Sequence, residues 1–171
     1  MTDWESGFTA GVAATIVGFV LTMIWDGYKY RRDVISRESS LIKGLIHELY
    51  ENRELATENK DIIKGDLESL KTQKTLLRPL LILKSGFWDY LKFNIPNKLL
   101  KNTDLLEKLK NISLLAEHIN ETIRSRQNYK DTSSAMIKFG ETIKTKDNII
   151  DSDLTRFNKS IDDVLSELEA I

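Results

Sequence analysis

Hydrophobic residues recur at helical spacing along most of the chain after residue 40. The first stripe steps by four and three residues and includes two asparagines: Leu45, Leu49, Asn52, Ala56, Asn59 and Ile63. The second stripe has no polar member and consists of Leu105, Leu109, Ile112, Ala116, Ile119 and Ile123. A third stripe near the end contains Leu154, Phe157, Ile161, Val164, Leu168 and Ile171. This spacing places apolar side chains on one face of each helix and predicts helices that pack together.

Polar and helix-breaking residues divide the predicted helices. We expect a turn at Gly65 and Asp66, with Asp66 capping the next helix, and another turn over residues 144–148. Between them, residues 76–83 read LLRPLLIL, where Pro79 should end or begin a helix. This run either belongs to the core or touches lipid, and its short length favours the core. No stretch alternates as a strand does, so the sequence predicts an all-α fold with an antiparallel helical bundle.

Residues 7–25 differ from the rest of the chain because nineteen consecutive positions carry no charge. About twenty apolar residues cross a bilayer as a helix, and Trp4 and Trp25 flank the run as interfacial anchors do. A cleaved signal peptide and a buried helix of a soluble domain are the alternatives; an acidic start and a long apolar core disfavour the signal peptide. We therefore expect a tail and transmembrane helix over residues 1–28 and a helical-bundle domain over residues 29–171.

Basic residues set the expected orientation of this helix. None precedes it, whereas Lys29, Arg31 and Arg32 follow it, and Lys and Arg stay on the cytoplasmic side of a membrane. The chain is thus expected to be a single-pass protein of the plasma or inner membrane, with its N-terminus outside and its C-terminal domain in the cytoplasm. The same three residues are expected to lie near lipid headgroups.

Small residues occupy one face of the uncharged run. Some recur every fourth position and others form a Gly-x-x-x-Gly pair: Gly7, Ala10, Gly11, Ala14, Gly18 and Thr22. Small residues allow two membrane helices to approach closely, so this face is a candidate seam for self-association. Ordinary transmembrane composition, in which Gly and Ala are common, explains the pattern equally well.

Charge and composition exclude several classes of function. The 25 Lys and Arg are balanced by 26 Asp and Glu, whereas a nucleic-acid-binding face needs concentrated basic charge, so nucleic acid is not an expected partner. The chain has no cysteine, which excludes thiolate chemistry. It has no phosphate loop, nucleophile elbow or zinc-helix motif, and His47 and His118 lie beside the stripes. We predict no catalytic residue, no cofactor and no metal site.

A few positions resemble a known group of proteins. Residues 45–52 have the form L-x-x-E-L-x-x-N, Trp88 follows in mid-chain, and a Leu/Ile-rich helix with Ile112, Ile119 and Asn120 comes later. This layout resembles a loose group of small, mostly uncharacterised prokaryotic proteins that carry a helical domain on a single membrane anchor. The resemblance implies a prokaryotic plasma or inner membrane, and it transfers no ligand or catalytic residue.

The expected function is that of a non-enzymatic, membrane-anchored helical bundle. Such a protein would have membrane lipid around its anchor and would assemble with itself or with a membrane-associated protein partner. The alternative is an oligomerising membrane effector, pore-forming or defence-type, that is triggered through its cytoplasmic domain. Membrane depolarisation on expression distinguishes the two, because a passive adaptor causes none.

Overall fold

The chain is helical through most of its described residues. The structure, a computed structural model, describes residues 3–71, 77–132 and 136–170, without the side chains of residues 3–14, 16, 87, 130–132 and 136–139. Its helices are α1 (Asp3–Lys71), α2 (Gly86–Leu91), α3 (Asn97–Leu100), α4 (Thr103–Thr132) and α5 (Met136–Leu168). No described residue lies in a strand, which confirms the all-α prediction for this part of the chain. The chain divides into two compact units, Met1–Ser40 and Leu41–Ile171.

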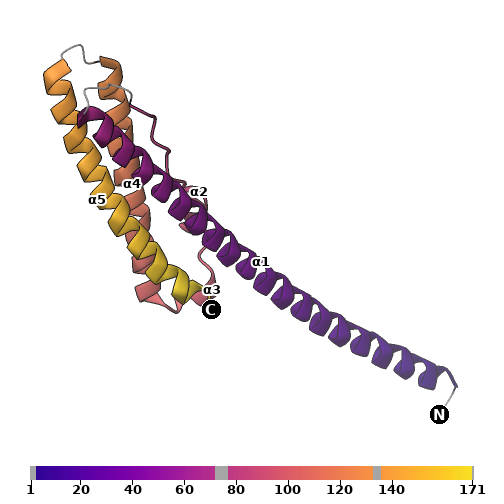
Figure 1. The fold of residues 1–171 in the computed structure, drawn as a ribbon. Coiled ribbons are helices and arrows are strands. Elements are labelled where there is room, and N and C mark those ends of the chain that lie inside the picture. Colours follow the sequence, from indigo (N-terminus) through magenta and orange to yellow (C-terminus); the bar gives the residue numbers. More distant parts are fainter. Residues whose placement is uncertain (1–2, 72–76, 133–135, 171) are drawn as a thin grey trace. The chain divides into compact units, whose positions relative to one another are not determined.

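Within the unit Leu41–Ile171, α4 and α5 lie side by side and run in opposite directions (Figure 1). Lys108 near the start of α4 donates to Glu167 near the end of α5 at 2.7 Å. Arg126 near the end of α4 pairs with Asp147 in the first half of α5. These two contacts fix the antiparallel register of the pair.

The part of α1 that follows Ser40 completes the bundle and also runs antiparallel to α5. Its Arg53 pairs with Asp162 at 3.2 Å, and its Lys60 donates to the Thr155 hydroxyl at 2.9 Å. Since α4 and α1 are both antiparallel to α5, they are parallel to each other. The prediction of an antiparallel bundle is thus correct for the pairs α1–α5 and α4–α5 and wrong for the pair α1–α4. Because α1 and α4 are parallel, the chain must return along α1 before α4 begins.

The three predicted stripes form the core of this unit. All their described members are buried, the two asparagines of the first stripe included; Ile171 lies outside the described residues. The described apolar members belong to one continuous cluster that also contains Leu80, Leu83, Leu91 and Leu99 from the chain between α1 and α4. The spacing of apolar residues in the sequence therefore identified the packing faces of the three long helices.

The predicted turn at Gly65 and Asp66 is wrong, because α1 continues to Lys71. Asp66 does not cap a helix; its side chain is buried and accepts hydrogen bonds from Arg78 and Arg126. A Cβ added to Gly65 would overlap with Nη2 of Arg78. The glycine thus leaves room for a guanidinium beside the helix instead of ending it.

The predicted turn over residues 144–148 is also wrong, because α5 is continuous from Met136 to Leu168. Ile143, Asp147 and Ile150 extend the third stripe toward the start of the helix, and all three are fully buried. The stripe is difficult to recognise in this polar stretch because one of its buried positions is a charged residue, Asp147, which pairs with Arg126 of α4.

Residues 77–85 form an extended segment that belongs to the core. Leu77, Leu80 and Leu83 are buried, and no helix ends or begins at Pro79 in the described residues. The expectation of a helix boundary at this proline is therefore wrong, whereas the core interpretation of the apolar run agrees with the burial of these leucines. Residue 76 lies outside the described residues.

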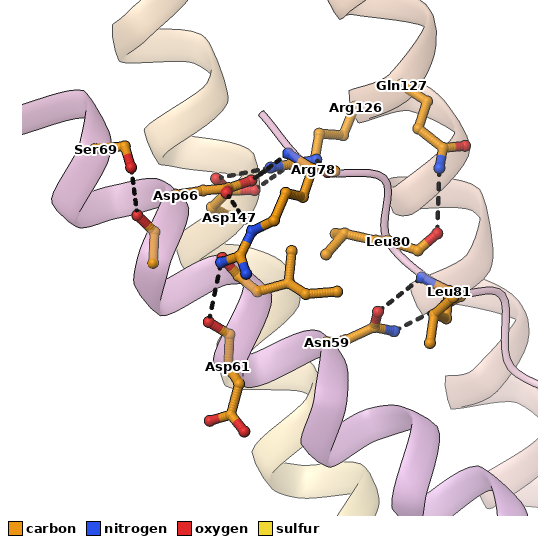
Figure 2. Close-up of polar contacts among 12 residues, drawn as sticks. Asn59, Asp61, Asp66, Ser69, Arg78, Leu80, Leu81, Arg126, Gln127 and Asp147 are labelled. Atoms are coloured by element: carbon orange, nitrogen blue, oxygen red, sulfur yellow. Dashed lines mark hydrogen bonds and ion pairs between the residues drawn. The ribbon is translucent and has the colours of Figure 1, made fainter. Parts of the chain in front are cut away.

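Two asparagines of α1 hold the backbone of this segment. The amide nitrogen of Asn59 donates to the carbonyl of Leu81 at 2.8 Å, and its amide oxygen accepts from the Leu81 N–H at 2.7 Å (Figure 2). Asn52 makes the same pair of bonds to Lys84, at 2.8 and 2.7 Å. Each amide thus satisfies both backbone groups of one residue, as a neighbouring strand does in a sheet.

Side chains of α4 hold the other edge of the segment. Asn120 donates to the carbonyl of Leu83 at 2.9 Å and accepts from its N–H at 2.8 Å. Gln127 donates to the carbonyl of Leu80 at 3.2 Å (Figure 2). The segment therefore lies between α1 and α4 and separates these two parallel helices with a hydrogen-bonded backbone.

The described part of the chain contains no helix that is long and apolar enough to cross a membrane. This finding contradicts the expectation of a single-pass protein of the plasma or inner membrane, with its N-terminus outside and its C-terminal domain in the cytoplasm.

We predict that Asn59→Ala lowers the free energy of unfolding by roughly 2–3 kcal/mol, because it leaves both backbone groups of Leu81 without their partners. Urea unfolding of the full chain, followed by far-UV circular dichroism, measures the change. Asn111→Ala is the matched control, since Asn111 is exposed on α4 and should change stability by less than about 0.5 kcal/mol. Equal losses of stability in Asn59→Ala and Asn111→Ala would show that Asn59 does not hold the extended segment of residues 77–85.

Candidate functional site

The most deeply buried charges of the described residues gather around Arg126 of α4 (Figure 2). Its side chain lies between two buried carboxylates, Asp66 of α1 and Asp147 of α5. Its Nε donates to Oδ1 of Asp147, its Nη2 donates to Oδ2 of Asp66 at 2.6 Å, and its Nη1 donates to the carbonyl of Arg78 at 3.0 Å. One guanidinium therefore joins all three long helices and the extended segment.

Arg78 adds a second cation at the edge of this network. Its backbone N–H and its Nε both donate to Asp66, at 3.1 and 3.3 Å. Its Nη2 donates to the carbonyl of Ile62 at 2.9 Å. The network thus contains two carboxylates and two guanidiniums, so its formal charges cancel.

The electrostatics of the network are set by burial and by the shared guanidinium. Burial raises the pKa of the Asp147 carboxyl above its ordinary value, and the hydrogen bond and charge of Arg126 oppose this rise. The nearby charge of Asp66 adds to the rise. All three nitrogens of the Arg126 guanidinium are engaged by the protein, so they are not available to polarise a substrate. We interpret the network as a clasp between helices.

Each of the three buried charges of the network continues an apolar stripe, and this is the signal that sequence analysis missed. Asp66 follows Ile63 by three residues, and Arg126 follows Ile123 by three residues. Asp147 lies four residues after Ile143 on the third stripe. Opposite charges at core positions of different helices indicate buried pairing, because an unpaired buried charge is strongly unfavourable.

The residues predicted to form an assembly seam lie on α1, in the unit Met1–Ser40. Several predicted side chains lie outside the description: Trp4, Gly7, Ala10, Gly11 and Ala14. Gly18 and Thr22 are described, and both are exposed. A Cβ added to Gly18 would meet no atom within 4 Å, and the Thr22 hydroxyl donates to the Gly18 carbonyl at 2.9 Å.

Large apolar side chains surround these two small residues on α1. They are between 46 and 65 % exposed and comprise Val17, Phe19, Val20, Leu21, Met23, Ile24 and Trp25. Consecutive positions of a helix point about 100° apart, so these side chains cover all of the segment except the face that carries Gly18 and Thr22. A helix that is apolar on all sides is normally buried, so residues 15–25 form the strongest candidate for an interaction surface.

The basic residues that follow the apolar segment are exposed as well. Lys29, Arg31 and Arg32 all lie on α1, and Nε of Arg32 lies 3.8 Å from Oδ1 of Asp33. Their predicted proximity to lipid headgroups stays a prediction. Trp25, the predicted interfacial anchor, packs against Tyr28 with ring centroids 6.2 Å apart.

The two histidines lie at the surface and pair with acids. Nε2 of His47 is 3.8 Å from Glu51, and Nε2 of His118 is 3.5 Å from Asp153. Within the residues that the structure describes, no three His, Cys, Asp or Glu side chains are arranged to hold a metal ion.

Comparison of the chain with known protein families, with curated proteins and with solved structures found no match. The resemblance to prokaryotic membrane-anchored helical proteins stays a prediction. The features of the chain that bear on its function are the apolar segment of α1, the clasp around Arg126 and the surface of the bundle.

We predict that Arg126→Met lowers the free energy of unfolding by about 3–5 kcal/mol near neutral pH, because it leaves the buried Asp147 carboxylate without a cation and removes one of the two guanidiniums that pair with Asp66. The loss should shrink as the pH is lowered from about 7 to about 5. Without Arg126, burial raises the pKa of Asp147 further, and a carboxyl with a raised folded pKa loses stability as the pH rises through that value.

Urea unfolding at several pH values measures this effect. Arg124→Met is the matched control, since Arg124 is exposed two residues earlier on the same helix. A loss of stability at Arg126 that does not change with pH would contradict the buried ion network.

Proposed function

We propose that this protein is a non-enzymatic helical bundle that assembles with further copies of itself through residues 15–25 of α1. The observation that supports the proposal is the exposure of seven large apolar side chains around this segment. Water in contact with so much apolar surface is unfavourable, and covering the surface is the main driving force of protein association.

The segment is suited to contact with an identical helix. Gly18 has open space around it, so the backbone of a second helix can approach closely at this position. The Thr22 hydroxyl is already bonded to the Gly18 carbonyl, so a partner does not need to supply a polar group there. No charged residue interrupts residues 15–25, so identical segments do not repel each other when they align.

The distribution of apolar side chains favours more than two copies. A dimer that meets at Gly18 covers one face of each helix, whereas the exposed apolar side chains of residues 17–25 occupy the rest of the helix circumference. Each Val, Leu, Ile, Phe or Met side chain that becomes buried contributes roughly 1.5–3 kcal/mol, while association costs about 4–15 kcal/mol. Covering several side chains per copy is therefore needed for a stable assembly.

The non-enzymatic part of the proposal rests on the engagement of the buried polar groups. The clasp around Arg126 uses its hydrogen-bonding groups to join helices, and the asparagines of the bundle use theirs to hold residues 77–85. These groups support packing of the bundle, and we assign none of them to a reaction.

We predict that the full chain forms an oligomer and that Gly18→Leu raises its dissociation constant at least tenfold. A leucine at this position fills the space through which a second backbone approaches, but it meets no atom of its own chain. Sedimentation velocity in a mild non-ionic detergent, over a range of protein concentrations, measures the change.

Gly27→Leu is the matched control for this substitution. A Cβ at Gly27 also meets no atom within 4 Å, and the residue lies about two and a half turns further along α1, on the opposite face. The control should leave the oligomer unchanged. A wild-type chain that stays monomeric, or one that associates only with added lipid vesicles, would contradict the proposal.

A further inference from the structure

A pocket lies beside the bundle, among α2, α3, α4 and the residues between α2 and α3. Its volume is about 280 Å³, close to the lower limit of pockets that hold small molecules. Its apolar wall consists of Trp88, Leu91, Ile95, Leu99 and Leu106. It lies within the unit Leu41–Ile171 and shares no lining residue with the clasp around Arg126.

The floor of this pocket is part of the packed core. Leu91 and Leu99 are buried members of the core cluster, and Trp88 and Leu106 pack against that cluster. Ile95 is more exposed and lies at the rim. A ligand that enters the pocket therefore meets an apolar surface that the bundle already holds in place, so little ordering of the protein is needed.

Two lysines complete the lining, and no acidic residue belongs to it. The ammonium of Lys92 donates to Oδ1 of Asp89 at 2.8 Å, so its charge is partly compensated. Lys110 lies one turn after Leu106 on α4, and its ammonium has no ion-pair partner among the described residues. The pocket thus combines an apolar interior with a positive edge.

We propose that this pocket binds a small amphipathic carboxylate, with its apolar body against Leu91, Leu99 and Leu106 and its carboxylate on the ammonium of Lys110. The apolar wall excludes a fully polar anion, because such a ligand would lose hydration without replacement. A neutral apolar ligand would leave the positive edge unused. The volume corresponds to about nine water molecules at roughly 30 Å³ each, which suits an unbranched chain of about ten carbons.

Decanoate is a suitable probe, and isothermal titration calorimetry of the full chain measures its binding. We expect one saturable site per chain, weaker binding of the neutral analogue 1-decanol, and no saturable binding of acetate, which lacks the apolar body. Each titration is corrected by the same titration into buffer without protein.

Lys110→Gln should weaken decanoate binding about tenfold, as expected for the loss of one charge-assisted hydrogen bond, and should leave decanol binding unchanged. Lys101→Gln is the matched control, because Lys101 is exposed directly after α3 and does not line the pocket. Ile95→Trp should abolish saturable binding of both decanoate and decanol by filling the pocket from its rim.

Three results would overturn the proposal. One is binding of decanoate that does not saturate and is the same in wild type and Lys110→Gln, as expected for adsorption to the apolar segment of α1. Another is equal affinity for decanoate and decanol, which removes the role of the charge. The third is full decanoate binding by Ile95→Trp while its circular dichroism remains that of the wild type, which places the ligand elsewhere. None of these results bears on self-assembly, which Gly18→Leu tests separately.

Discussion

A buried extended backbone needs partners for its N–H and C=O groups, and residues 77–85 have no neighbouring strand in the described part of the chain. An unpaired buried backbone group costs about as much as a lost hydrogen bond. Asparagine solves this problem because one amide both donates and accepts. Asn52, Asn59 and Asn120 each hold one residue of the segment in this way. The segment can therefore lie between two helices and contribute its leucines to the core.

This arrangement has consequences for the rest of the bundle. The segment carries the chain back along α1, so that α1 and α4 can run parallel while α5 runs opposite to both. The clasp of Asp66, Arg126 and Asp147 then joins the three helices near one end. A buried ion pair adds little net stability in comparison with apolar packing, but breaking it is costly. We therefore assign to the clasp the role of fixing helix register.

The sequence predicted the helices and their packing faces well, because apolar residues at heptad-like spacing are a local signal. It failed where a polar residue occupies a core position. Asn52 and Asn59 were placed correctly on their stripe, but nothing local shows that their partners are backbone groups more than twenty residues away. Asp66 and Asp147 were placed in turns for the same reason, since burial of their charge depends on Arg126 from another helix. The positive edge of the pocket also depends on tertiary structure, because Lys92 follows α2 and Lys110 lies on α4.

Amide hydrogen exchange of the full chain tests most directly whether residues 77–85 are held as a core element. The backbone N–H groups of Leu81, Leu83 and Lys84 are donors to the asparagine amides. Our account predicts that they exchange as slowly as the N–H groups in the middle of α4, because they open only when the bundle unfolds. Exchange at the rate of an unstructured peptide, while α4 and α5 stay protected, would contradict it, since the bundle would then be stable without the segment.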